Sequence, residues 1–305
     1  MPKFRLGVAA LILSAILASP AFAHEVGVVH TPEVDIGYET FGAAGHGMPV
    51  IAVNGGPGLS HAYMLVNDMW LKVAKHRLVV FYDQRGTGAS KHLQPGAPQT
   101  MDAQVADLEA VRAKLGLQKV ALVGDSYGGM LVMAYAAAHP DHVAKLVLSD
   151  SAAPSWNSMV HLLPQTFPDI EAQDEAEKKK LGDSTDAAAR ASLLNHFKMI
   201  FYSPDKLAAY LAHMGDLGYE PAIGEAVAAA TADLDLTPKL AEFTGFPTLV
   251  ISGRYDMNVA PLTAWRMAHQ IPGAKIVFFE QSGHLPSYEE PAKYRAVLEA
   301  FLDAR

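Results

Sequence analysis

The six residues from Gly124 to Gly129, with the sequence GDSYGG, constrain the fold of this chain more than any other segment. They follow the apolar run of residues 120–123 and precede residues 130–139, whose composition suits a helix. A strand, a tight glycine-flanked turn with a central serine, and then a helix is the context in which G-x-S-x-G presents a nucleophile. Small residues are needed because the turn is strained and the helix packs close to the strand. The pattern predicts that Ser126 is a nucleophile at the edge of a sheet, and an ordinary glycine-rich turn is the alternative.

Short apolar runs alternate with helical patterns along most of the chain. The 305 residues are 50% hydrophobic and 18% charged, which suits a globular protein rather than a disordered one. The inner runs are continuous and rich in Val, Leu and Ile, as strands are in a parallel sheet that is buried on both faces. We therefore expect an α/β fold, with a mostly parallel central sheet covered by helices. The expected strands are residues 26–30, 36–41, 49–53, 78–82, 120–123, 145–148, 248–252 and 275–279, and the clearest helices are residues 101–115, 262–270 and 292–302.

Residues 154–243 break this alternation, because they contain no convincing strand and read as helices separated by Pro and Gly. An insertion at this point of an α/β fold lies above the carboxyl edge of the sheet, where ligands bind. We expect residues 24–153 and 244–305 to form the core and residues 154–243 to form a helical cap over the site. Helices that only pack on the outside of the core are the alternative. The run from Lys178 to Lys180 is expected to be a solvated helix face.

The first residues have the pattern of a secretory signal peptide. Lys3 and Arg5 give a positive start, residues 6–18 form an apolar run too short to span a bilayer comfortably, and the sequence AFA ends at Ala23 as a cleavage site. We expect residues 1–23 to be removed, and the protein to be periplasmic or secreted, with no stable membrane insertion after cleavage. An uncleaved N-terminal anchor is the alternative.

Composition and charge exclude several functions. The chain has no cysteine, so thiol nucleophiles and thiolate metal ligands are excluded. The formal net charge of −8 argues against a nucleic-acid partner. The sequence also has no H-E-x-x-H pattern, phosphate-binding loop or dinucleotide fingerprint. We therefore expect no metal and no organic cofactor.

Two later residues supply the base and the acid that a serine nucleophile requires. Free serine is a poor nucleophile at neutral pH, so an imidazole must take its proton and an acid must orient that imidazole. Of 13 histidines, only His284 is both late in the chain and placed directly after an expected strand. Asp256 follows the expected strand 248–252, and Ser126, Asp256 and His284 have the chain order of an α/β-hydrolase triad. Asp150 also follows an expected strand and is the competing acid.

A glycine-rich loop is expected to stabilise the negative charge that forms on the substrate carbonyl. The segment NGGPG begins at Asn54, directly after the expected strand 49–53. Glycines let the backbone approach the substrate, so the backbone N–H of Gly56 is one expected donor of the oxyanion hole. The backbone N–H of Tyr127 is the other, because it directly follows the nucleophile.

The segments NGGPG, DQRGTGAS, GDSYGG, GRYD and SGH, in this order and spacing, resemble the prolyl aminopeptidase (proline iminopeptidase) family of α/β-hydrolases. The resemblance covers essentially the whole mature chain. It implies hydrolysis of an N-terminal residue, often proline, through an acyl-enzyme, with a small molecule or short peptide as substrate. In DQRGTGAS, Asp83 and Arg85 are expected to brace the loop near the oxyanion hole rather than to take part in the chemistry.

Three positions depart from the family pattern. Asn54 stands where the family motif usually has His, Tyr127 where it often has Trp, and Met257 where some relatives have an acidic residue after the triad Asp. An aminopeptidase needs a carboxylate to hold the α-ammonium group of its substrate. Glu220 and Glu225 in the helical cap are the candidates, and solvated helix glutamates are the alternative.

Four functions compete on this basis. The family motifs favour an exported aminopeptidase or amidase, and an esterase or lactonase would use the same triad. An epoxide hydrolase or dehalogenase is disfavoured, since those enzymes use a carboxylate nucleophile and this chain has Ser126. An inactive binding protein of the same fold is disfavoured by the intact Ser, Asp and His set.

Overall fold

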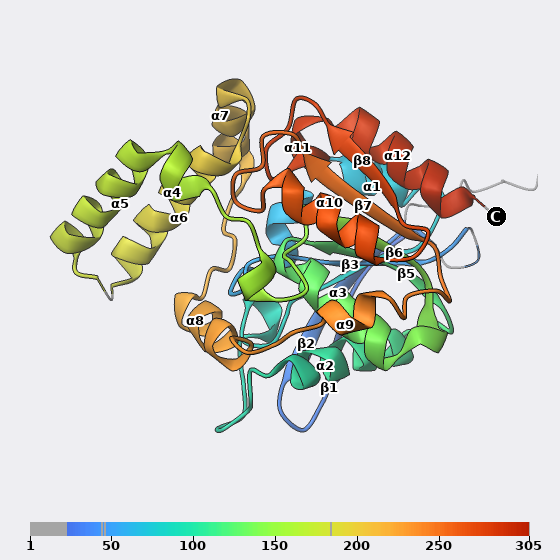
Figure 1. Cartoon of the computed structure of the whole chain (residues 1–305). Helices are drawn as coiled ribbons and strands as arrows, with labels where there is room; N and C mark the ends of the chain where they lie inside the picture. The colour runs from blue at the N-terminus through green and yellow to red at the C-terminus, as the bar shows by residue number, and fades with distance from the viewer. Residues whose placement is uncertain (1–22, 44, 46, 184, 305) are drawn as a thin grey trace, which may run out of the picture.

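An eight-stranded sheet forms the centre of the protein (Figure 1), with strand order β1-β2-β4-β3-β5-β6-β7-β8. The computed structural model describes residues 23–304 except residues 44, 46 and 184, so all of the expected signal peptide except Ala23 lies outside the described residues. The pairs β1–β2 and β2–β4 are antiparallel, and the other neighbours are parallel. Every expected strand is present: β1 His24–His30, β2 Asp35–Phe41, β3 Val50–Val53, β4 Val79–Tyr82, β5 Val120–Asp125, β6 Val143–Ser149, β7 Thr248–Gly253 and β8 Lys275–Phe279.

Helices cover both faces of this sheet. The longer ones of the core are α2 Met101–Lys114, α3 Tyr127–Ala138, α10 Pro261–Gln270 and α12 Pro291–Asp303, with the short α1 Met69–Val73 and α11 Pro286–Glu289. The short 3-10 turns are η1 His61–Leu65, η2 Gly88–Ser90, η3 Pro140–His142 and η4 Trp156–Ser158. Helix α2 begins where the sequence predicts, because the Thr100 side chain accepts a hydrogen bond from the backbone N–H of Ala103. It ends before Gly116, whose φ of +66° lies in the left-handed region that glycine adopts easily.

Successive residues of the central strands face two different hydrophobic cores. In β3, Val50 and Ala52 belong to the core under α1 and α12, whereas Ile51 and Val53 belong to the core under α2, α3 and α10. Successive side chains of a strand point to opposite faces, so a strand covered on both sides must be apolar throughout. This is why the strands were recognisable in the sequence as continuous apolar runs.

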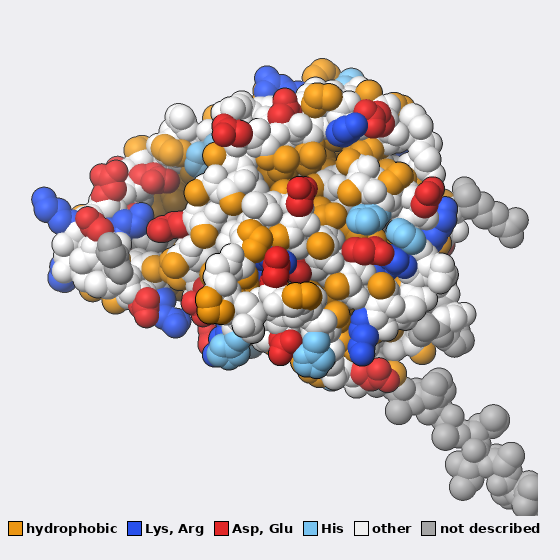
Figure 2. Space-filling view, turned by 90° about the horizontal axis from the view of Figure 1, so that it is seen from below, with side chains coloured by type: hydrophobic (Ala, Val, Ile, Leu, Met, Phe, Trp, Pro, Cys, Tyr) orange, Lys and Arg blue, Asp and Glu red, His pale blue; other side chains and the backbone are white. Residues whose placement is uncertain are grey.

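Residues 154–243 contain helices and, in their described part, no strand. The helices are α4 Leu163–Thr166, α5 Pro168–Leu181, α6 Asp186–Ile200, α7 Pro204–His213, α8 Pro221–Ala230 and α9 Thr237–Leu240. The pair α5 and α6 projects from the core at the left of Figure 1, and acidic and basic side chains stand together on this projection in Figure 2. By contrast, Val227, Leu240 and Phe243 pack into the core. The insert thus has a projecting part and a packed part, and the domain limits at residues 154 and 243 stay predictions.

Candidate active site

Ser126 lies in the sharp turn between β5 and α3. Its backbone has φ +52° and ψ −122°, a conformation that non-glycine residues rarely adopt. The flanking glycines permit this turn, because a Cβ on Gly128 would collide with the carbonyl of Val53 and one on Gly124 would collide with the carbonyl of Gly128. The turn therefore requires the small residues that the G-x-S-x-G pattern provides. Ser126 lines a cavity of about 360 Å³.

His284 and Asp256 form a buried pair in the same region. His284 Nδ1 lies 2.7 Å from Asp256 Oδ2, and both side chains are buried. The other oxygen, Asp256 Oδ1, accepts backbone hydrogen bonds from Asn258 and Val259, each at 2.9 Å. Burial acts to lower the pKa of His284, but the charge and hydrogen bond of Asp256 outweigh it and raise that pKa above its usual value. The structure thus brings Asp256 and His284 together, and His284 lines the cavity with Ser126.

Asp150, the competing acid, lies beside this pair. Its Oδ1 accepts a hydrogen bond from the backbone N–H of Gly253 at 2.8 Å, and its φ is +44°. Burial and the charge of Asp256 raise the pKa of Asp150 well above its usual value. Ligand atoms of Asp150, Asp256 and His284 all lie within 4.8 Å of one another, although the hydrogen bond to His284 Nδ1 comes from Asp256. This geometry favours Asp256 as the acid that orients the imidazole.

The loop after β3 is held by side chains that the sequence did not single out. Gly55 donates its backbone N–H to the Tyr63 hydroxyl at 2.5 Å, and Tyr63 in turn donates a short hydrogen bond to Asp125 Oδ2. Burial raises the pKa of Asp125 to about 6, although the charge of His284 and the hydrogen bond from Tyr63 act to lower it. Since Tyr63 occupies the N–H of Gly55, the next N–H along the loop belongs to Gly56, which lines the cavity and has a φ of +123°.

The second expected oxyanion donor is the N–H of Tyr127, the first residue of α3. The first N–H groups of a helix have no partner within the helix, so they are available to a developing negative charge. Asn54, which stands where the family usually has His, donates its side-chain amide to the carbonyls of Gly55 at 2.9 Å and Leu59 at 2.8 Å. It therefore braces the loop that carries Gly56.

Asp83 and Arg85 have different structural roles. Asp83 Oδ1 accepts from the backbone N–H of His61 at 3.0 Å and lies 2.7 Å from His61 Nδ1, so it anchors η1, which follows the oxyanion loop of residues 54–58. Arg85 binds Asp107 through two hydrogen bonds of 2.6 and 2.8 Å and pairs with Glu33 at 2.8 Å. It holds α2 and the β1–β2 loop rather than the oxyanion loop.

The cap contributes charged side chains to the cavity, but from α5 rather than α8. Glu220 and Glu225 are exposed on or beside α8 and do not line the cavity that contains Ser126. Glu171, Asp174 and Lys178 do line it. Lys179 and Lys180 are exposed, and Lys178 lines the cavity while its side chain remains 42% exposed, so the run stays a largely solvated helix face.

The three α5 charges are not equivalent. Asp174 pairs with Lys178 Nζ at 2.6 Å and accepts from Asn195 Nδ2 at 3.1 Å. Burial acts to raise the pKa of Asp174, but these partners outweigh it and lower that pKa. Within the described part of the chain, the half-buried carboxylate of Glu171 has neither a hydrogen-bonded nor an ion-paired partner. The hydrogen bond to Asp174 raises the pKa of Lys178 and the charge of Glu171 adds to this effect, but no ion pair among the described residues holds the Glu171 carboxylate.

No helix within residues 23–304, the unplaced positions aside, combines the length and the apolar character needed to cross a membrane.

Comparison with known proteins adds the family context. The profile described as the alpha/beta hydrolase fold matches residues 48–291. The proline iminopeptidase of Lactobacillus helveticus is 32% identical over 286 residues, covering 88% of this chain and 95% of that protein. A crystal structure of proline iminopeptidase from Mycobacterium smegmatis matches with a TM-score of 0.67 at 25% identity, over 91% of this chain and 97% of that one. An esterase from Exiguobacterium antarcticum matches with a TM-score of 0.70 at 23% identity, over 91% and 98%.

Proposed function

Because the chain belongs to the proline iminopeptidase family of α/β-hydrolases, we propose that it is a serine hydrolase that releases the N-terminal residue of a short peptide or amide. The observation that carries the proposal is the buried contact of 2.7 Å between His284 Nδ1 and Asp256 Oδ2, next to the cavity that Ser126 lines. A carboxylate that holds Nδ1–H fixes the tautomer in which Nε2 has no proton. Nε2 is then the base for the serine hydroxyl.

The proposed reaction has two symmetrical halves. His284 Nε2 takes the proton of Ser126, whose Oγ attacks the substrate carbonyl, while Asp256 stabilises the imidazolium that forms. The N–H groups of Gly56 and Tyr127 hold the oxyanion. His284 then gives its proton to the leaving amine, and the acyl group stays on Ser126. Water, deprotonated by His284, attacks this ester. His284 then returns the proton to Ser126 Oγ as the bond between Oγ and the acyl carbon breaks and the free amino acid leaves.

We assign the recognition of the substrate's α-ammonium group to Glu171. Glu171 lines the cavity and forms no ion pair in the described part of the chain, whereas Asp174 pairs with Lys178 at 2.6 Å. An ammonium–carboxylate hydrogen bond is worth about 1.5–3 kcal/mol, which corresponds to roughly a 10- to 100-fold change in affinity. Glu220 and Glu225 do not line the cavity, so they stay the second choice for this role.

An esterase or general amidase is the second candidate. Lys178 brings a positive charge into the same cavity, which is unfavourable for a cationic substrate. The esterase of Exiguobacterium antarcticum shares the fold. On that hypothesis the same triad acts on substrates that have no free amine.

A substrate panel separates the two candidates. It would compare prolyl, alanyl and N-acetyl-alanyl arylamides and a short-chain aryl ester, with wild type, Glu171→Gln and Glu175→Gln. Glu175 is exposed on the same helix and serves as the matched control. An aminopeptidase should lose affinity for free-amine substrates only, and only in Glu171→Gln. Equal rates on capped and free substrates would establish the esterase or amidase instead.

We also propose that the protein is exported, with cleavage after Ala23. The proposal rests on the charged start, the short apolar run and the AFA site in the sequence. Cleavage there would leave His24 as the first residue, at the start of β1. Intact mass measurement of the protein from a fractionated bacterial host would give a chain beginning at His24 outside the cytoplasm. A full-length cytoplasmic chain would contradict export.

A further inference from the structure

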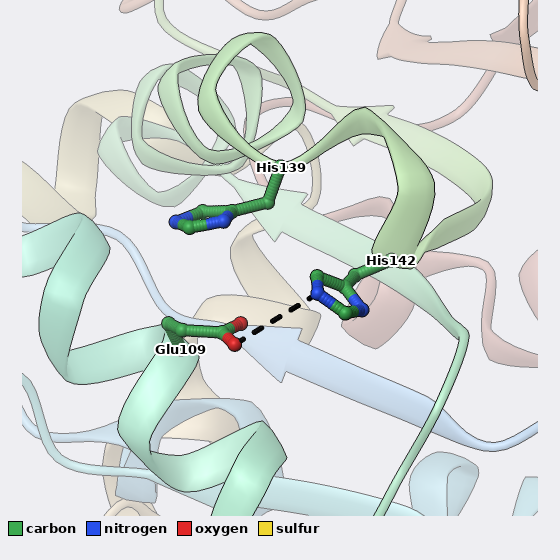
Figure 3. Close-up of side chains that lie close together, drawn as sticks. All are labelled: Glu109, His139 and His142. Atoms are coloured by element: carbon green, nitrogen blue, oxygen red, sulfur yellow. Dashed lines mark ion pairs between the residues drawn. The ribbon is translucent and has the colours of Figure 1, made fainter.

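Three potential metal ligands converge far from Ser126, at the other end of α3. Glu109 comes from α2, His139 caps the C-terminus of α3, and His142 lies in η3. Their ligand atoms all lie within 4.8 Å of one another, and Figure 3 shows the three side chains pointing toward a common space. Helix α3 has 12 residues, so this cluster is about 18 Å from the turn that carries Ser126. The proposed hydrolysis uses none of the three.

Both imidazoles are available to a metal ion. His142 Nδ1 lies 3.0 Å from the carbonyl of Gln118, so Nδ1 carries the proton and Nε2 faces Glu109 Oε1 at 4.0 Å. A metal-binding histidine characteristically donates its other N–H to a carbonyl or carboxylate in this way. The ring of His139 has no hydrogen-bonded partner among residues 23–304 as far as they are described, and it lies against the ring of Tyr135.

Glu109 contributes a carboxylate whose two oxygens are occupied to different extents. Arg112 donates to Oε2 at 2.8 Å and to Oε1 at 2.5 Å, and the Tyr135 hydroxyl donates to Oε2 at 2.6 Å. A carboxylate oxygen accepts two hydrogen bonds, so Oε2 is filled while Oε1 keeps one lone pair. The lone pair that remains is on the oxygen nearest to His142.

We propose that Glu109 Oε1, His139 and His142 Nε2 bind one divalent transition metal ion, with Zn²⁺ as the probe. Two imidazoles and one carboxylate are a ligand set that zinc takes, with water in the fourth position. Neighbouring ligands of a tetrahedral zinc are about 3.4 Å apart, so the partly exposed side chains need to approach by only about an ångström. The C-terminal end of α3 favours a cation, whereas the charge of Arg112 opposes one and weakens the site. The ion would tie the end of α3 to α2.

The proposal is tested by titrating tag-free protein with Zn²⁺ in a calorimeter and by measuring thermal unfolding with and without the ion. The variants are His142→Asn and His139→Asn, with His30→Asn as the matched control. His30 is an exposed histidine that pairs with Asp35 at 2.7 Å and is not one of the three clustered ligands. Circular dichroism establishes that each variant is folded. Because neither readout uses turnover, the result does not depend on the proposed hydrolysis.

Wild type and His30→Asn should bind one ion, with a rise in Tm of roughly 5–10 °C at a hundredfold excess over Kd. The two cluster variants should lose this shift. Equal binding in wild type and His142→Asn would place the ion elsewhere and overturn the proposal. The absence of any Tm shift in wild type at millimolar Zn²⁺ would also overturn it.

Discussion

Replacing Tyr63 by Phe should damage both stability and catalysis, because its hydroxyl connects the oxyanion loop to the strand that carries the nucleophile. The hydroxyl accepts from the N–H of Gly55 and donates to Asp125, and all of these groups are buried. Burial raises the pKa of the Tyr63 hydroxyl well above its usual value, so the phenol keeps its proton and remains a donor. Removing the hydroxyl leaves one N–H and one carboxyl group without this partner.

The expected loss of stability follows from the two buried groups that lose their hydrogen-bond partner. A buried polar group left unpaired costs about 1–3 kcal/mol, and neighbouring losses do not add fully, so the free energy of unfolding should fall by about 2–4 kcal/mol. Tyr210→Phe is the matched control, because Tyr210 is also buried but makes a single 3.3 Å hydrogen bond, to the carbonyl of Tyr63. It should cost about 0.5–1.5 kcal/mol.

Urea unfolding and steady-state kinetics measure the two effects. Gly56 follows Gly55 in the loop, so a displaced loop misplaces an oxyanion donor. Losing such a donor costs up to about 10²–10³ in kcat, and we expect a loss of at least about tenfold in Tyr63→Phe with little change in KM. Equal destabilisation by Tyr63→Phe and Tyr210→Phe, or an unchanged kcat in Tyr63→Phe, would refute the reasoning.

Three other predictions follow from single features of the structure. Asp256→Asn should lower kcat by about 10⁴, since an amide stabilises the wrong tautomer of His284. Asp150→Asn should cost less than about tenfold, since the hydrogen bond to His284 Nδ1 comes from Asp256. A larger loss of kcat in Asp150→Asn than in Asp256→Asn would make Asp150 the orienting acid. Burial acts to lower the pKa of His61, but its hydrogen bonds to two carboxylates raise that pKa to about 9. His61 therefore contributes fully to the free energy of unfolding below pH 6.5, and this contribution is lost as the pH rises to about 9. Urea unfolding at a series of pH values should show this loss in wild type but not in His61→Gln. Gly128→Ala should lower Tm sharply, because its Cβ would meet the carbonyl of Val53, whereas Gly245→Ala has open space and should leave Tm unchanged.

The sheet and the nucleophile turn were predictable because their signals are local. A strand buried on both faces must be a run of Val, Leu and Ile, whatever its neighbours are. The turn at Ser126 requires small residues within two positions on either side, and these are visible in the sequence. The placement of Asp256 and His284 followed from the strands that precede them, since the carboxyl ends of parallel strands share one edge of a sheet.

The charged groups of the cavity were harder to predict, since the packing of the cap decides which of its side chains face the cavity. Glu171, Asp174 and Lys178 are spaced by three and four residues, which places them on one face of a helix. That spacing was the available signal, but it does not say which face of α5 looks into the cavity. Glu220 and Glu225 illustrate the same difficulty in α8.

The contact of Tyr63 with Asp125 was not predictable from local sequence at all. The two residues are 62 positions apart, and each has an ordinary alternative role: a core aromatic and a turn aspartate. They meet because the loop after β3 folds back over the end of β5, its neighbour in the sheet. Such a pair is determined by tertiary structure alone.

The central claim is that Ser126 forms the covalent intermediate, and labelling with a serine-directed fluorophosphonate tests it most directly. Peptide mass mapping of the labelled protein should find one adduct, on Ser126, with loss of arylamide hydrolysis in proportion to labelling. Ser126→Ala should be folded, unlabelled and inactive. An adduct on another residue that abolishes activity, or substantial hydrolysis by Ser126→Ala, would contradict the account.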